Sequence, residues 1–220
     1  MGVFITGTDT GIGKTVVSAA VIQRYRSESK LCYWKPIQTG IESDDDTTAV
    51  RALGECRDEE IFDEGVRLTR PLSPHLSAEL SNTEIDLESL LSLFLPRADS
   101  ASWIVEGAGG LLVPINKNSL MIDLIKKLRS PAVIVARSSL GTINHTLLSI
   151  EALRNRSIPT AGVVMVGEPN RENRRAIERY GEIAVLAEMP LFSSLTPSIL
   201  ATWARDQLDR DGLLREFFCV

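Results

Sequence analysis

Short runs of apolar residues alternate with longer segments of mixed polarity along the 220-residue chain. Continuous apolar runs are typical of strands buried on both faces of a parallel sheet, and they predict strands at residues 3–5, 31–37, 103–105, 132–136, 161–166 and 183–186. Helical patterns fill much of the intervening sequence, at residues 16–29, 47–53, 86–95, 120–128, 141–155 and 171–180, and residues 70–75 are expected to form a loop. The alternation predicts an α/β fold in which residues 1–220 form one domain, a parallel sheet with helices on both faces.

A glycine-rich segment directly follows the first predicted strand. Residues 7–15 fit the P-loop pattern, in which Gly13 precedes Lys14 and Thr15 closes the loop. Glycines let the backbone N–H groups turn inward around phosphate oxygens, and the following helix N-terminus adds partial positive charge. In this pattern Lys14 reaches the β- and γ-phosphates, and the Thr15 hydroxyl holds Mg²⁺. The segment predicts a P-loop NTPase fold whose nucleotide contacts include Gly11, Ile12, Gly13, Lys14 and Thr15.

Two further residues with candidate chemistry lie at the ends of predicted strands. Lys35 is close to the end of the second strand, and Glu106 opens a glycine-rich bend at residues 106–110. Because loops that follow parallel strands lie on one edge of the sheet, residues 7–15, Lys35, Glu106 and residues 141–144 can converge there. A second lysine beside Lys14 would suit phosphoryl transfer, although position alone equally allows Lys35 to be a solvated lysine.

Acidic residues from separate loops are candidate magnesium ligands. Asp46 and Glu106 could complete a Mg²⁺ shell with Thr15, because this ion prefers oxygen ligands and keeps several waters. Asp44 and Asp45 stand beside Asp46, and an acidic loop can also be a solvated surface. The sequence therefore leaves open which of the three aspartates binds the metal.

Composition and charge exclude several classes of function. The net charge of -5, from 24 basic and 29 acidic residues, argues against a duplex nucleic-acid binder with a broad basic face. The three cysteines are odd in number and lack CxxC spacing, so neither a zinc site nor a disulfide framework is expected. No apolar run approaches a membrane span, and the N-terminus lacks the basic region of a signal peptide. We expect a soluble cytoplasmic protein with small-molecule partners.

Five segments, spread over most of the chain, carry a combined signal. They are the P-loop at residues 7–15, Lys-Pro-Ile-Gln-Thr-Gly at 35–40, Ser-Pro-His at 73–75, Val-Glu-Gly-Ala-Gly-Gly at 105–110 and Leu-Gly-Thr-Ile-Asn-His at 140–145. In this order they closely resemble the dethiobiotin synthetase family. The resemblance implies an enzyme of biotin synthesis that closes a ring on 7,8-diaminopelargonic acid with CO2 or bicarbonate and ATP. It also implies Mg²⁺ as cofactor, the products ADP and phosphate, and a homodimer whose substrate sites lie near the subunit interface.

The resemblance also implies a mechanism. One substrate amine captures CO2 as a carbamate, whose oxygen attacks the γ-phosphate, and the second amine displaces phosphate from the resulting carbamic-phosphoric anhydride. Lys14 and Lys35 would stabilise the carbamate and the phosphoryl group, with Thr10 as a hydroxyl donor. Thr15, Asp46 and Glu106 would bind Mg²⁺. The implied substrate contacts are Thr39, Glu106, Gly107, Ala108, Gly109, Gly141 and Asn144, the last two receiving the distant carboxylate from the partner subunit.

Two positions depart from the family pattern. Gly11 stands where some members carry glutamate, which matters little because the loop acts through its backbone. Many members carry an asparagine that reads the adenine edge where this chain has Val166. The base contacts are then expected from Val166, Gly167 and Pro190, and the base selectivity stays open.

Other classes of P-loop protein remain as alternatives. ParA-like partition or regulatory ATPases act by nucleotide-dependent dimerisation and carry a lysine directly before the paired glycines of the loop, where this chain has Thr8, Asp9 and Thr10. The synthetase half of a cobyrinic-acid amidotransferase would need a further glutaminase domain. A pure nucleotide-binding module is the third alternative. Turnover that requires the diamine would separate the enzyme from both binding classes.

Overall fold

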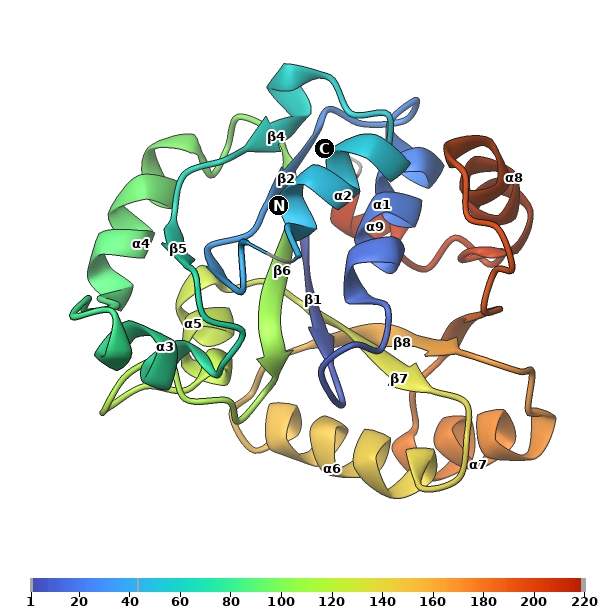
Figure 1. Cartoon of the computed structure of the whole chain (residues 1–220). Helices are drawn as coiled ribbons and strands as arrows, with labels where there is room; N and C mark the ends of the chain where they lie inside the picture. The colour runs from blue at the N-terminus through green and yellow to red at the C-terminus, as the bar shows by residue number, and fades with distance from the viewer. Residues whose placement is uncertain (1, 43, 219–220) are drawn as a thin grey trace.

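All strand pairings of the main sheet are parallel. The computed structural model describes residues 2–42 and 44–218, and its seven-stranded sheet has the order β4-β2-β6-β1-β7-β8-β9 (Figure 1). The strands are β1 Gly2–Gly7, β2 Leu31–Trp34, β4 Ile61–Phe62, β6 Ser102–Gly110, β7 Ala132–Arg137, β8 Thr160–Val166 and β9 Val185–Met189. A separate two-stranded sheet pairs β3 (Ile37–Thr39) with β5 (Val66–Leu68). Because the main sheet is parallel, its loops after strands converge on one edge.

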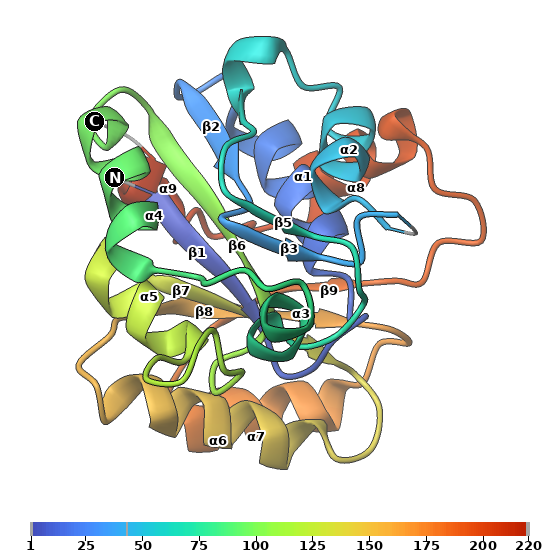
Figure 2. The same cartoon turned by 60° about the vertical axis from the view of Figure 1, so that its left-hand side comes forward.

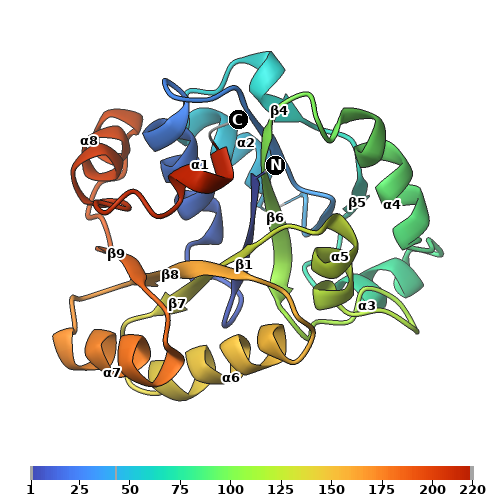
Figure 3. The same ribbon diagram turned by 180° about the vertical axis from the view of Figure 1, so that it is seen from behind.

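Helices cover both faces of the main sheet. They are α1 Lys14–Tyr25, α2 Asp46–Leu53, α3 Pro74–Leu80, α4 Leu87–Phe94, α5 Met121–Leu128, α6 Thr142–Arg154, α7 Arg171–Gly181, α8 Pro197–Gln207 and α9 Arg215–Phe218, with short 3₁₀ turns at Asp58–Glu60 and Leu95–Arg97. Strand β1 shows the two cores: Val3 and Ile5 join the cluster containing α1, α8 and α9, and Phe4 joins the cluster containing α4 to α7. The helices lie on opposite sides of the sheet in Figures 2 and 3. Burial on both faces explains the continuous apolar runs, and the predicted α/β architecture is confirmed.

The predicted strand at residues 31–37 is wrong in its second half. Strand β2 ends at Trp34, and after Lys35 and Pro36 the chain continues in β3, in a different sheet. Pro36 has no backbone N–H to donate to a sheet and restricts the residue before it, so the strand breaks there. Lys35 therefore lies in a break at the carboxyl edge of the main sheet.

The glycine-rich segment at residues 106–110 is a continuation of β6 and not a bend. It stays paired with β1 as far as Gly110, which lies opposite Gly7 after a register shift. A Cβ on Gly110 would approach the Gly7 carbonyl oxygen to 2.9 Å, so only glycine allows the two chains to lie this close. The strand carries Glu106 beneath the P-loop.

Several other boundaries differ from the prediction. Helix α1 ends at Tyr25 and not near residue 29, and the last strand covers Val185–Met189 and not residues 183–186. The predicted loop at 70–75 runs into α3, and helices α8 and α9 and strands β4 and β5 were not predicted. Helices α3 and α8 both carry proline in their first turn, a start signal that the sequence did offer.

Two observations concern the classes excluded by composition. In the part of the chain that the structure describes, no helix combines the length and apolar character needed to span a membrane. Cys32 and Cys56 are free thiols, and Cys219, the third cysteine, lies outside the described residues.

Candidate functional site

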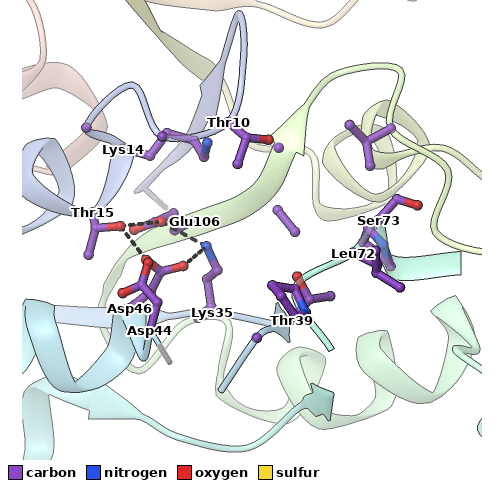
Figure 4. Close-up of a pocket in the computed structure, with 18 residues that line it drawn as sticks. Thr10, Lys14, Thr15, Lys35, Thr39, Asp44, Asp46, Leu72, Ser73 and Glu106 are labelled. Atoms are coloured by element: carbon purple, nitrogen blue, oxygen red, sulfur yellow. Dashed lines mark hydrogen bonds and ion pairs between the residues drawn. The ribbon is translucent and has the colours of Figure 1, made fainter. Parts of the chain in front are cut away.

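A pocket of about 570 Å³ opens between the P-loop and the carboxyl edge of the main sheet. Its walls come from five separate parts of the chain, which Figure 4 shows facing one another across the opening. The lining residues are Thr10, Gly11, Gly13, Lys14, Thr15, Lys35, Thr39, Gly40, Asp44, Asp46, Pro71, Leu72, Ser73, Pro74, Glu106, Ala108, Gly109 and Val113. The P-loop, Lys35 and Glu106 therefore converge as expected from a parallel sheet, whereas residues 141–144, which were expected at the same place, do not line this pocket.

The P-loop has the conformation that its glycines predict. Gly11 and Gly13 have φ values of 69° and 95°, in the left-handed region that favours glycine, and α1 begins directly after Gly13. Lys14 is buried, and its Nζ donates to the Asp9 carbonyl oxygen at 3.1 Å. The Asp9 carboxylate accepts from the Thr10 backbone N–H at 2.7 Å and pairs with Arg137. Contacts of Asp9 with Lys14, Thr10 and Arg137 thus fix the loop at the N-terminus of α1.

Four polar side chains meet at the floor of the pocket. The Thr15 hydroxyl lies 2.6 Å from Asp46 Oδ1 and 3.1 Å from Glu106 Oε1. Lys35 Nζ lies between the same two carboxylates, 2.5 Å from Asp46 Oδ2 and 2.9 Å from Glu106 Oε1. It also donates to the Gly107 carbonyl oxygen at 3.2 Å. The structure therefore brings together the four residues that the sequence placed on different loops, and the alternative of a solvated Lys35 is wrong (Figure 4).

The environment sets the charges of this cluster. Burial and the neighbouring Lys35 lower the pKa of Lys14. Burial alone would lower the pKa of Lys35, but Glu106 and Asp46 outweigh it and raise that pKa. Burial alone would raise the pKa of Asp46, but Lys35 and the Thr15 hydrogen bond bring it below its ordinary value. Lys35 and Asp46 are therefore a charged pair at neutral pH.

The three neighbouring aspartates have different surroundings. Asp45 caps α2, accepting from the Thr48 backbone N–H at 3.1 Å and from the Thr48 hydroxyl at 2.8 Å. Asp44 is exposed at the rim of the pocket. Only Asp46 contacts Thr15 and Lys35, so the geometry favours it as the aspartate of the site.

Two side chains that the sequence analysis missed hold the other oxygen of Glu106. Ser18 and Tyr33, both buried, lie 2.8 Å and 3.0 Å from Glu106 Oε2. Ser18 follows Lys14 by one helical turn, and this spacing was the available signal for its position on the same face of α1. Burial and the nearby Glu106 raise the pKa of Tyr33 well above its ordinary value, so its hydroxyl remains a neutral donor.

The predicted base contacts line a second pocket of about 700 Å³, next to the first. The two pockets share Thr10, Gly11 and Gly13 of the P-loop, and the second adds Ile12, Val166, Gly167 and Pro190. Val166 lies close to the loop, since a Cβ on Gly13 would approach its side chain to 3.6 Å. The two pockets thus lie next to each other on the P-loop.

The predicted substrate residues divide into two groups. Thr39, Ala108 and Gly109 line the first pocket, and Gly107 contributes its carbonyl oxygen to Lys35. Gly141 and Asn144 lie exposed at the start of α6 and line neither of these two pockets. A single chain does not bring this pair to the phosphate edge, and their role stays a prediction.

The donor atoms at the floor suit a hard, oxygen-loving cation. Thr15, Asp46 and Glu106 offer one hydroxyl and two carboxylates, the ligand types that Mg²⁺ selects. Within the described residues there is no group of three or more histidine, cysteine, aspartate or glutamate side chains able to hold a metal. A few protein ligands completed by waters and nucleotide phosphates are the usual arrangement for Mg²⁺, so the site fits that ion.

Comparison with known proteins gives concordant sequence matches. Residues 1–198 match a family model described as an AAA domain. The chain is 48% identical to the ATP-dependent dethiobiotin synthetase BioD of Paramagnetospirillum magneticum, covering 91% of this chain and 93% of that protein. It is 45% identical to BioD of Brucella ovis, covering 89% of each. The biotin biosynthesis bifunctional protein BioCD of Bordetella avium is 47% identical over 97% of this chain, which spans only 44% of that longer relative.

Solved structures give a more distant likeness. A ParA family ATPase from Chlorobium tepidum has a TM-score of 0.57 at 11% identity, covering 93% of this chain and 99% of that one. A chain of the MinC:MinD cell division complex of Aquifex aeolicus has a TM-score of 0.56 at 12% identity, covering 92% and 85%. At such identities these similarities concern the fold alone.

Proposed function

Because the chain belongs to the dethiobiotin synthetase family, we propose that its pocket carries out ATP-dependent ring closure of 7,8-diaminopelargonic acid with CO2. The observation that carries the proposal is Lys35, fixed between Asp46 and Glu106 and facing the P-loop lysine across one pocket. The ParA-like alternative has support only from fold similarity at 11–12% identity. We retain the cytoplasmic location as a prediction.

The P-loop and the floor of the pocket would have separate roles, phosphate binding and metal binding. Residues 11–15 would bind the ATP phosphates, and Thr15, Asp46 and Glu106 would hold Mg²⁺, directly or through water. Bound Mg²⁺ would neutralise charge on the transferring phosphoryl group. Asp46 and Glu106 would then share their negative charge between the metal and Lys35, leaving the Lys35 ammonium less neutralised and able to face a substrate anion.

The chemistry would proceed in two displacements. A carbamate oxygen on one substrate amine attacks the γ-phosphorus, and the bond to the ADP oxygen breaks. The second amine then attacks the carbonyl carbon of the mixed anhydride, the bond from that carbon to the phosphate oxygen breaks, and inorganic phosphate leaves with the proton that the amine gives up. Lys14, Lys35 and the Thr10 hydroxyl would stabilise the negative charge that develops on the oxygens in both steps.

The rest of the pocket would hold the diamine. Thr39 and the backbone at Ala108 and Gly109 would contact its reacting end, in a pocket that Leu72 and Ser73 also line. Val166, Gly167 and Pro190 would contact the nucleotide base in the adjoining pocket. Apolar contacts and backbone atoms would then replace the asparagine amide that many relatives carry.

A homodimer would bring Gly141 and Asn144 to a neighbouring site. Leu112, Leu140 and Leu148 are 56%, 99% and 55% exposed, and Leu112 and Leu148 line a pocket of about 580 Å³ between the P-loop region and α6. Exposed apolar side chains that lie together, as Leu112 and Leu148 do around this pocket, mark interaction surfaces. We assign this surface to a second copy, whose Asn144 would receive the distant carboxylate of the substrate.

One assay tests the reaction itself. Purified protein is given ATP, Mg²⁺ and bicarbonate with and without the diamine, and phosphate and dethiobiotin are measured. We expect phosphate release to require the diamine and to match dethiobiotin formation. ATP hydrolysis that proceeds equally without the diamine would instead support a binding or partition ATPase.

A mixing experiment tests the shared site. Lys14→Ala and Asn144→Ala proteins are each expected to be inactive, but a mixed dimer contains one site with both natural residues. Random mixing would restore activity at about a quarter of the sites. No recovery, with mixed dimers demonstrated by differently tagged subunits, would show that Asn144 acts within its own subunit or not at all.

A further inference from the structure

The two oxygens of Glu106 have separate sets of partners. Oε1 faces the pocket floor, where it accepts from Lys35 at 2.9 Å and lies 3.1 Å from the Thr15 hydroxyl (Figure 4). Oε2 is turned into the protein, where Ser18 lies at 2.8 Å and Tyr33 at 3.0 Å. The residue is completely buried, so water does not compete for either oxygen. The carboxylate is therefore held in one rotation about its terminal bond.

Tyr33 is the more constant of the two inner donors. The Ser18 hydroxyl lies within reach of both Glu106 Oε2 and the Lys14 carbonyl oxygen, at 2.8 Å and 3.0 Å, and its single proton can serve only one of them at a time. Within the described residues, the Tyr33 hydroxyl has Glu106 as its one hydrogen-bond acceptor. Tyr33 is fixed in turn by its place in β2, paired with Ile104 two residues before Glu106.

We propose that Tyr33, assisted by Ser18, is a positioning residue that orients Glu106 so that only Oε1 is presented to Lys35 and to the metal site. Without the inner donors the carboxylate can rotate, which places Oε2 or both oxygens toward the floor and loosens the contacts to Lys35 and Thr15. Partners of this kind behind a metal ligand affect metal affinity or activity about 10- to 100-fold. The inference rests on the proposed function in taking Glu106 as part of a magnesium site.

A purely structural role for Tyr33 makes a different prediction. A buried tyrosine whose hydroxyl merely needs a partner would affect folding stability when replaced, without selectively changing metal affinity. Tyr25 provides the matched control, because it is also fully buried and donates to a carboxylate, that of Asp209, in a separate part of the structure. Replacing either tyrosine with phenylalanine removes one hydroxyl and preserves the ring.

The test measures metal affinity in two independent ways. Binding of Mn²⁺ to the protein with ADP is followed by electron paramagnetic resonance, and the Mg²⁺ concentration for half-maximal dethiobiotin formation is determined kinetically. We expect Tyr33→Phe to weaken both about 10- to 100-fold, with a smaller change in the KM for the diamine. Tyr25→Phe is expected to lower the unfolding midpoint and leave both metal measurements within about threefold of the natural protein.

A double variant separates action through Glu106 from a general effect. In a Glu106→Gln background, Tyr33→Phe should cause no further loss of Mn²⁺ affinity, because the oriented carboxylate is already absent. A folded Tyr33→Phe protein with unchanged Mn²⁺ affinity, or full additivity with Glu106→Gln, would overturn the proposal. If Tyr33→Phe does not fold, Ser18→Ala takes its place, and unchanged Mn²⁺ affinity in that variant overturns the proposal equally. Failure of the proposed function would show differently, as absence of dethiobiotin formation by the natural protein.

Discussion

Replacing Lys35 with alanine should impair catalysis and folding together. The lysine is 2% exposed and compensates Asp46 and Glu106 at 2.5 Å and 2.9 Å. Its removal leaves two neighbouring carboxylates without their cation, and breaking a buried pair by removing one partner costs about 3–5 kcal/mol of folding stability. The Asp46 side chain is 22% exposed, so water relieves part of this cost and we expect about 3 kcal/mol. Turnover should fall about a hundredfold to a thousandfold, the effect of losing one electrostatic stabiliser of transferring charge.

The stability loss should depend on pH in a definite direction. In the natural protein the folded-state pKa of Asp46 is lowered, so its stabilising contribution is present above the unfolded-state pKa and is lost as pH falls through the folded value. In the variant, Asp46 loses the cation that lowers its pKa, and burial then raises the folded-state pKa of this carboxyl above its unfolded value. Protonation then removes the buried charge as pH falls. The difference in unfolding free energy between the two proteins should be largest near pH 8 and smaller near pH 5.

Urea unfolding across this pH range, together with dethiobiotin formation at saturating Mg²⁺, measures both effects. Lys30→Ala is the control, because Lys30 is an exposed lysine directly before β2 and contacts neither carboxylate. Turnover of Lys35→Ala within about tenfold of the natural protein would refute its assignment to charge stabilisation. An unfolding free energy equal to that of Lys30→Ala at every pH would refute the buried ion-pair reasoning.

Three other predictions use different measurements. Asp46→Asn should raise the Mg²⁺ requirement at least about tenfold, whereas Asp44→Asn should change it less than about threefold; equal effects in Mg²⁺ titrations would reverse the choice between them. Burial and Lys35 lower the pKa of Lys14, so this lysine loses its charge below pH 10.5, the ordinary pKa of a lysine. The kcat/KM for ATP should therefore decline on the alkaline side before pH 10.5 is reached. A kcat/KM that stays constant up to pH 10.5 would contradict this prediction. The natural protein should discriminate weakly among ATP, GTP and CTP, and Val166→Asn should sharpen its preference for ATP in kcat/KM. Strong selectivity that the substitution leaves unchanged would show that another segment reads adenine.

The sequence by itself determined the features that depend on neighbouring residues. Apolar runs predicted the strands because a strand covered on both faces must be apolar throughout, and the confirmed α/β architecture followed from their alternation with helices. The P-loop was readable because Gly13, which has a left-handed φ of 95°, stands directly before Lys14 and Thr15 as the pattern requires. The family was recognisable because short motifs such as these stand in a fixed order along the chain.

The ends of strands were harder to predict where the local sequence pattern disagrees with pairing to a strand far away in the sequence. Residues 31–37 look like one strand, yet the chain leaves the main sheet at Pro36 and pairs with β5 instead. Glycines 107, 109 and 110 suggest a bend, yet pairing with β1 holds them in β6. Strand pairing joins residues far apart in sequence, so no local window contains the deciding information.

Only the tertiary structure decided which side chains of the site contact one another. Asp46 contacts Thr15 and Lys35, whereas the adjacent Asp45 caps the N-terminus of α2. Composition and sequence position did not show which of these aspartates belongs to the site. The tertiary structure also turned Tyr33 toward Glu106, although nothing in the sequence around Tyr33 indicates a polar partner. The physical reason is that a hydrogen bond needs an approach within about 3 Å, and such distances between strands and loops are fixed only when the whole sheet is packed.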